Sequence, residues 1–233
     1  MRAVSTRSSS LLAVFALAFL GPLIVFLVLA EEVQDREHFG WDTPIIRSVH
    51  DLRLPGVHEL MQAISFVGGF PGIQLLALGI VLGLLFRRRA ADALFVAASV
   101  AGAETLAQLL KHVFARPRPV LPYAPPAHTF SFPSGHATDS AALATAVVLL
   151  LWPTRRRWHA VAGGALFVIA VGISRVYLGV HFPSDVLAGW CVGISWVAGV
   201  RALRGLASTR ASAARARASA PTGSPARSTP RRR

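Results

Sequence analysis

The sequence is poor in cysteine, in carboxylates and in charged residues of any kind. Its 233 residues include a single cysteine, Cys191, so no disulfide bond can form within the chain, and a lone thiol in an apolar stretch is expected to serve packing. Only 11 residues are Asp or Glu, and charged residues make up 15% of the chain against 53% hydrophobic ones. With a mean hydropathy of +0.52, this composition excludes an ordinary soluble domain and predicts a membrane protein.

Two features that often indicate ligand binding do not indicate it in this sequence. The Gly-rich segment 68–72 is not followed by the Lys-Ser/Thr pair of a phosphate-binding loop, so we interpret it as a hinge that starts a membrane helix. The net charge of +13 does not indicate a nucleic acid partner, because seven of the positive charges are arginines in segment 205–233, which has no carboxylate. We predict that this Ser/Ala/Pro/Arg-rich segment is a disordered cytoplasmic tail that contacts anionic membrane lipids.

Six apolar stretches predict six transmembrane helices. The clearest, 11–30, has 20 residues without a charge, enough to cross a hydrocarbon core of about 30 Å at about 1.5 Å per residue. It is longer than the core of a secretory signal, which has about 7–15 residues. The other stretches are 70–86, 90–114, 137–152, 160–179 and 186–203. We therefore expect an all-α integral membrane domain over 11–204, after a cytoplasmic N-terminus of residues 1–10.

Arginines gather on one side of this predicted six-helix bundle. Short cytoplasmic loops are enriched in Lys and Arg, and this bias sets the orientation of a membrane protein. The arginine groups, all on the side of the two termini, are at 2 and 7, 87–89, 155–157, and 201 and 204. Acidic residues gather instead in the first loop, between 31 and 42. We therefore expect both termini in the cytoplasm and the first loop outside, with a short interfacial helix near 43–52.

Three short polar clusters lie at the expected extracytoplasmic ends of the apolar stretches. They are Lys111 with Arg118-Pro119, Pro133-Ser134-Gly135-His136, and Ser174-Arg175 with His181 and Asp185. Together they supply three cations that can hold phosphate oxygens, two histidines that can share nucleophilic and acid roles, and one carboxylate that can orient the second histidine. Ionisable residues between membrane spans are costly and point to function. The combination predicts a phosphatase.

The local sequence around each cluster favours a fixed site. Pro119 and the proline before Arg118 end a helix and stiffen its exit, which would hold that arginine in place, whereas the role of Arg116 stays open. Ser134 is expected to cap the next helix, whose free N–H groups and Gly135 would let an anion approach. His136 at that helix start is placed to protonate a leaving oxygen.

The spacing within the clusters resembles the motifs of the type-2 phosphatidic acid phosphatase superfamily. Lysine is followed after six residues by Arg-Pro, Pro-Ser-Gly-His is intact, and Ser-Arg is followed after five residues by His and after three more by Asp. The resemblance covers about residues 60–200. It implies that His181 attacks phosphorus to form a phosphohistidine, that Asp185 holds its ring, and that His136 acts as acid and then as base. It assigns the phosphoryl oxygens to Lys111, Arg118, Ser134, Gly135 and Arg175.

Several alternatives stay open at this point. Two histidines and a carboxylate could bind zinc, but three neighbouring cations would repel a divalent ion, so we expect no metal cofactor. The substrate is expected to be a lipid phosphate in the bilayer, either undecaprenyl diphosphate or a glycerolipid phosphate such as phosphatidic acid or phosphatidylglycerophosphate. A phosphotransferase of the same family plan, or a transporter or non-catalytic scaffold, are the competing hypotheses. We expect Glu104 and Asp139, both inside apolar stretches, to form structural pairs.

Overall fold

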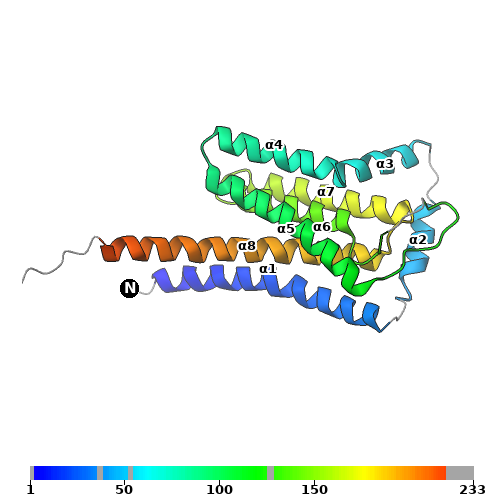
Figure 1. Ribbon diagram of the computed structural model, residues 1–233, viewed down its shortest axis with the longest axis horizontal. Helices are drawn as coiled ribbons and strands as arrows, with labels where there is room; N and C mark the ends of the chain where they lie inside the picture. Colours follow the sequence, from blue (N-terminus) through cyan, green and yellow to red (C-terminus); the bar gives the residue numbers. More distant parts are fainter. Residues whose placement is uncertain (1–2, 36–38, 52–54, 125–128, 219–233) are drawn as a thin grey trace, which may run out of the picture.

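The computed structural model describes residues 3–35, 39–51, 55–124 and 129–218, and the regular elements within these ranges are all α-helices (Figure 1). The predicted all-α class is therefore confirmed. The helices are α1 (Ala3–Gln34), α2 (Asp42–His50), α3 (Val57–Gly68), α4 (Gly72–Phe86), α5 (Ala90–Phe114), α6 (Gly135–Leu151), α7 (Arg157–Tyr177) and α8 (Pro183–Ala218).

Four of the described helices are long and apolar enough to cross a membrane. They are α5, α7, the part of α1 over Leu17–Gln34 and the part of α8 over Pro183–Arg210. A fifth span results if α3 and α4 count as one helix, bent by 47° at the Gly-rich segment that the sequence predicts as a hinge. The apolar helix α6 has only 17 residues, about 26 Å at 1.5 Å per residue, which is less than a hydrocarbon core of about 30 Å. Helix length therefore does not confirm six spans, and that number stays a prediction.

The first loop contains more helix than the sequence indicates. The predicted helix near 43–52 is present as α2, although its place at a membrane interface stays a prediction. The following helix, α3, is not expected from the sequence, because His58, Glu59 and Gln62 interrupt its apolar residues. Both helices lie at the same end of the bundle as the α5–α6 loop (Figure 1).

The C-terminal helix continues into the segment predicted as a disordered tail. Helix α8 ends at Ala218, so the first part of 205–233 is helical rather than disordered. The remainder, 219–233, lies outside the described residues, as do residues 1–2 of the N-terminal segment. The domain boundaries and the lipid contacts of the tail stay predictions.

Helix α8 is the central element of the bundle. It packs against α6, α1 and α5, while α6 also contacts α5 and α7. The N-terminus and the C-terminal end of α8 lie at one end of the molecule, and α2 lies at the other (Figure 1). The ends of α5 and α7 and the starts of α6 and α8 therefore meet at the α2 end.

Two glycines let α8 approach the first turns of α6 closely. A Cβ atom on Gly189 would lie 2.6 Å from the carbonyl oxygen of Ser134, and one on Gly193 would meet the carbonyl oxygen of Thr138. Glycines one helical turn apart allow such backbone contact between membrane helices. They place the start of α6 directly against α8.

We expect Gly189→Val to destabilise the protein, because the new side chain must push α6 away from α8. Overpacking of this kind costs about 1–3 kcal/mol, and thermal unfolding in detergent measures the resulting fall in Tm. Gly205→Val is the matched control on the same helix, since nothing lies within 4 Å of a Cβ atom there. An equal fall in Tm for the two variants would contradict the close contact of α6 with α8.

Candidate active site

The structure brings the three polar clusters of the sequence together at the α2 end of the bundle. The first lies at the end of α5 and in the loop after it, the second at the start of α6, and the third runs from the end of α7 into the first turn of α8. The N–H of Ser134 donates to the carbonyl oxygen of Asp185 at 3.0 Å. A guanidinium nitrogen of Arg118 lies 3.4 Å from Nε2 of His181. Residues from all three clusters are therefore in contact.

His181 lies between a carboxylate and a cation. Its side chain is 1% exposed, in the turn between α7 and α8. Its Nδ1 is 3.5 Å from Oδ2 of Asp185, longer than a hydrogen bond, and has no hydrogen-bond partner within the described part of the chain. Since Nε2 faces Arg118, the two ring nitrogens have different neighbours: Nδ1 faces the carboxylate and Nε2 faces positive charge.

Burial and nearby cations together disfavour a charged imidazole at this position. Burial is the larger cause, and the charges of the neighbouring Arg175, Arg118 and Lys111 add to it, so the pKa of His181 lies well below its usual value. The imidazole is therefore neutral near neutral pH. A neutral ring has a lone pair on one nitrogen, as a nucleophile requires.

The carboxylate of Asp185 is held by three donors. The hydroxyl of Ser131 and the N–H of Phe182 donate to Oδ2, the latter at 2.8 Å, and a guanidinium nitrogen of Arg116 donates to Oδ1 at 2.6 Å. Because Oδ2 already accepts two hydrogen bonds, the more distant His181 ring faces the carboxylate without a short bond to it. These donors fix the direction in which the carboxylate faces the imidazole.

Arg116 links this carboxylate to the first loop. Its guanidinium also donates to Oδ2 of Asp42, the first residue of α2, at 3.0 Å, and to the hydroxyl of Ser184 at 2.8 Å. Asp42 in turn accepts from the N–H and the hydroxyl of Ser184, at 2.9 and 2.6 Å. The guanidinium lies over the ring of Phe182, 4.2 Å from its centroid. The sequence left the role of Arg116 open and did not indicate Asp42, one of several acids in its loop.

The three predicted cations are each held by neighbouring groups. Lys111 is buried and donates to the carbonyl oxygen of Phe130 at 3.2 Å. Arg118 donates to the carbonyl oxygens of Thr129 and Val180, at 2.8 and 2.7 Å. Arg175, near the end of α7, donates to the hydroxyl of Ser65 in α3. Each side chain is thus fixed rather than free to swing in solvent.

Besides Nδ1 of His181, two other buried polar atoms of the predicted site lack partners. Within the described ranges, the hydroxyl of Ser134 and the Nε of Arg175 have no hydrogen-bond partner. Ser134 takes the predicted capping position of α6, but its side chain makes no capping hydrogen bond, so that part of the expectation is wrong. Buried unpaired donors are costly and occur where a ligand can bind them. Gly135 follows Ser134 and starts α6, close to the Lys111 side chain.

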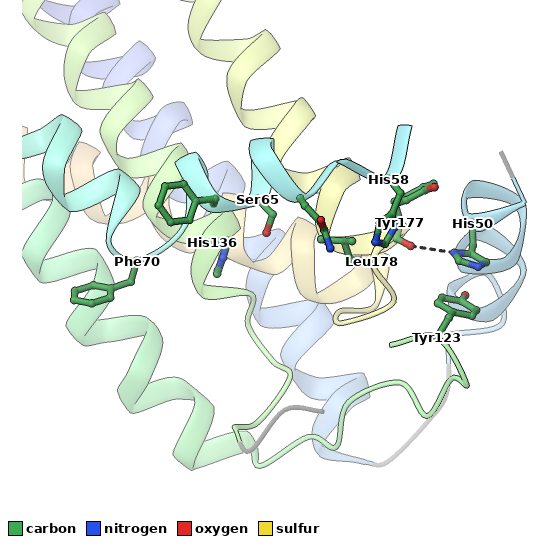
Figure 2. Close-up of a pocket in the computed structure, with 10 residues that line it drawn as sticks. His50, His58, Ser65, Phe70, Tyr123, His136, Tyr177 and Leu178 are labelled. Carbon is green, nitrogen blue, oxygen red and sulfur yellow. Dashed lines mark hydrogen bonds between the residues drawn. The ribbon is translucent and has the colours of Figure 1, made fainter. Parts of the chain in front are cut away.

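The other histidine, His136, opens onto a cavity of about 440 Å³ (Figure 2). It belongs to the first turn of α6, and Gly69 packs against its ring so closely that a Cβ atom there would overlap the imidazole. The Gly-rich segment therefore has a second task besides the bend between α3 and α4: it makes room for His136. The sequence shows the glycines but not what they contact.

The two carboxylates inside apolar helices differ in their surroundings. Gln108 donates to Glu104 of α5 at 2.8 Å, whereas Asp139 of α6 is buried and its Oδ1 has no hydrogen-bond partner among the described residues. Glu104 thus has the expected structural partner, and a pair for Asp139 stays a prediction.

Comparisons with known proteins agree with this geometry. A model of the PAP2 superfamily matches residues 92–207. The chain is 31% identical to phosphatidylglycerophosphatase B of Bacillus subtilis strain 168, over 73% of this chain and 87% of that protein. It is 30% identical to the undecaprenyl-diphosphatase of Sulfolobus acidocaldarius, over 75% of this chain and 85% of that protein. The chain therefore belongs to the PAP2 superfamily.

Solved structures show the same fold. The crystal structure of a transmembrane PAP2-type phosphatidylglycerolphosphate phosphatase from Bacillus subtilis aligns with a TM-score of 0.71 and 28% identity, covering 80% of this chain and 96% of that one. The crystal structure of Aquifex aeolicus LpxE aligns with a TM-score of 0.57 and 23% identity, covering 70% and 95%, and supports the fold alone. With its long apolar helices, the chain is thus a membrane protein of this superfamily.

We expect Arg116→Gln to destabilise the protein by about 3–5 kcal/mol, because it leaves Asp42 and Asp185 buried without their shared cation. Adding Asp42→Asn to Arg116→Gln should restore part of the lost stability, since Asp185 is then the one carboxylate left without this cation. Thermal unfolding in detergent measures both changes, with the exposed Arg155→Gln as control. A single variant as stable as the wild type would contradict the network.

Proposed function

We propose that the protein is a membrane phosphatase that hydrolyses a lipid phosphate or diphosphate through a phosphohistidine on His181. The observation that carries this proposal is the placement of its ring, with Nδ1 toward Asp185 and Nε2 toward Arg118. A nucleophile needs a free lone pair directed at the phosphorus, and a phosphoryl group needs fixed positive charge around its oxygens. The position of Nε2 beside a fixed cation supports this assignment.

In the first step, Nε2 of His181 attacks phosphorus and the bond from phosphorus to the leaving oxygen breaks. His136 gives its proton to that oxygen, so the alcohol or phosphate leaves in protonated form. The attacking ring gains positive charge as the bond from nitrogen to phosphorus forms. The carboxylate of Asp185 on the Nδ1 side stabilises this charge.

In the second step, water replaces the histidine on phosphorus. His136 now takes a proton from the water, whose oxygen bonds to phosphorus while the bond to Nε2 breaks and its electron pair returns to the ring. Inorganic phosphate leaves, and His136 is again protonated. The net reaction consumes one water and yields the free leaving group and phosphate.

The cations bind the phosphoryl oxygens in this mechanism. Lys111, Arg118 and Arg175 converge on the site, and the unpaired Ser134 hydroxyl and Arg175 Nε are available as further donors. Negative charge on the equatorial oxygens grows in the transition state, so donors fixed in advance lower the barrier. No metal is needed for this charge, and we propose metal-independent hydrolysis. Among the described residues, no three His, Cys, Asp or Glu side chains form a metal site.

We infer that the site faces the outside of the cell and takes its substrate from the bilayer. The arginine groups 87–89 and 155–157 lie between helices at the end opposite α2, which the positive-inside rule assigns to the cytoplasm. The names of the relatives support phosphatidylglycerophosphate or undecaprenyl diphosphate as substrate types. A site at helix ends lets a lipid tail stay in the membrane while the headgroup reaches the cations.

The test of this function is phosphate release by the purified protein from lipid phosphates and diphosphates in mixed micelles containing chelator. We expect release by the wild type, and a loss of at least about 10³-fold in kcat for His181→Ala, because in this mechanism only His181 bonds to the phosphorus. His159→Ala, an exposed histidine in α7, is the matched control. Wild-type rates in a folded His181→Ala variant would contradict the mechanism.

The lowered pKa of His181 predicts the pH dependence of the reaction. Because the neutral ring attacks, the loss of kcat/KM caused by its protonation should occur only well below the usual histidine pKa of about 6.5. Arg118→Gln removes one cation that lowers this pKa, so the acid limb of the profile should move to higher pH. The profile of each variant is compared with wild type on the same substrate, which cancels the ionisation of the phosphate itself. An acid limb that stays at the wild-type pH in Arg118→Gln would contradict the assignment of this limb to His181.

A further inference from the structure

The cavity beside His136 differs in character between its sides. It is bounded by α2, α3, the α5–α6 loop and the end of α7. In Figure 2, Phe70 lies on one side of His136, and His58, His50 and Tyr123 lie on the other. The Phe70 side chain is 78% exposed, so that side is open and apolar. The opposite side is lined by imidazole and phenol groups.

The histidine that lines this cavity indicates which part of the substrate the cavity contacts in the proposed reaction. His136 lines the cavity and His181 does not. In the proposed mechanism His136 protonates the leaving oxygen, whereas His181 bonds to the phosphorus. The cavity is therefore the space for the leaving group, and its walls act on the leaving group rather than on the phosphate that is transferred.

The wall opposite Phe70 is rich in hydrogen-bond donors and lacks carboxylates. Its polar side chains are His50 from α2, His58 from α3, and the phenols Tyr123 and Tyr177. None of the described residues that line the cavity is Asp or Glu. Asp51 and Glu59, the acidic residues next to the two histidines in sequence, are exposed and do not line it. Such a wall suits an anion and disfavours a cationic headgroup.

The two imidazoles are held around the end of α7. The Nδ1 of His50 is 3.3 Å from the carbonyl oxygen of Tyr177, and its ring stacks on Tyr123. The ring of His58 lies against Tyr177, with 6.2 Å between centroids. Arg175 is two residues before Tyr177, and its partner Ser65 also lines the cavity. The donor wall therefore continues directly from the predicted phosphate-binding cations.

We propose that this wall, formed by His50, His58, Tyr123 and Tyr177, binds a second phosphate that belongs to the leaving group. The inference rests on the proposed function and narrows its substrates to lipids with two phosphates in the headgroup. The bond that breaks joins the terminal phosphorus to the leaving oxygen, and the second phosphate departs with the lipid. The two phosphates can be joined directly, as in a prenyl diphosphate, or through a glycerol, as in phosphatidylglycerophosphate. When a lipid monophosphate is bound, no phosphate occupies the wall.

The test compares two pairs of lipids that differ in the second phosphate. The pairs are farnesyl diphosphate with farnesyl monophosphate, and phosphatidylglycerophosphate with phosphatidic acid, all in the same mixed micelles. The readout within each pair is kcat/KM for the lipid with two phosphates divided by kcat/KM for the lipid with one. This ratio cancels any general loss of activity. We expect His58→Ala to lower the ratio at least about tenfold in the pair whose second phosphate reaches the wall, since hydrogen bonds to charged groups are worth that much.

Two further variants separate binding of an anion from support of the fold. His58→Arg keeps a cationic donor and should keep the ratio near the wild-type value. His159→Ala, at the other end of α7, should leave both ratios unchanged. If His58→Ala lowers the ratio in one pair and not in the other, the affected pair identifies how the two phosphates of the substrate are joined. Unchanged ratios in an active His58→Ala enzyme would overturn the subsite, whereas no phosphate release from any of these lipids by the wild type would overturn the proposed function itself.

Discussion

The buried carboxylate of Asp185 joins the segments that form the site. Its side chain accepts from Ser131, Phe182 and Arg116, and its carbonyl oxygen accepts from the N–H of Ser134. These groups come from the α5–α6 loop, the α7–α8 turn and the start of α6. A carboxylate without water is tolerated only where donors and opposite charge replace that water, so the anion requires all of them at once. The position of His181 therefore depends on contacts made by Asp185.

The same network connects the first loop to the chemistry. Asp42 at the start of α2 shares Arg116 with Asp185, and α2 and α3 then supply one wall of the cavity at His136. The helices that bound the cavity at His136 are thus fastened, through Arg116, to the carboxylate beside His181. In the mechanism that we propose, α2 and α3 contact the leaving group, while the cations contact the transferred phosphate.

The sequence predicts the site better than it predicts what surrounds it. The residues of the three clusters stand at the ends of apolar stretches with fixed spacing, and charge is rare in such stretches, so they are easily recognised. Arg116 and Asp42 are 74 positions apart, and their contact depends on how α2 docks, which no local pattern encodes. Gly69 likewise shows its importance only once His136 is seen against it. The helix α3 is hidden because His58 and Gln62 line a cavity instead of facing a core.

The central claim is that His181 carries the phosphoryl group, and rapid-quench labelling with a lipid bearing ³²P in its terminal phosphate tests it most directly. Phosphohistidine is stable to base and labile to acid, which distinguishes it from phosphate esters of serine. Our account predicts base-stable, acid-labile label on the peptide that contains His181, increased when His136→Ala slows the attack of water and absent from His181→Ala. Label on His136, or release of phosphate by His181→Ala at the wild-type rate without labelled protein, would contradict it.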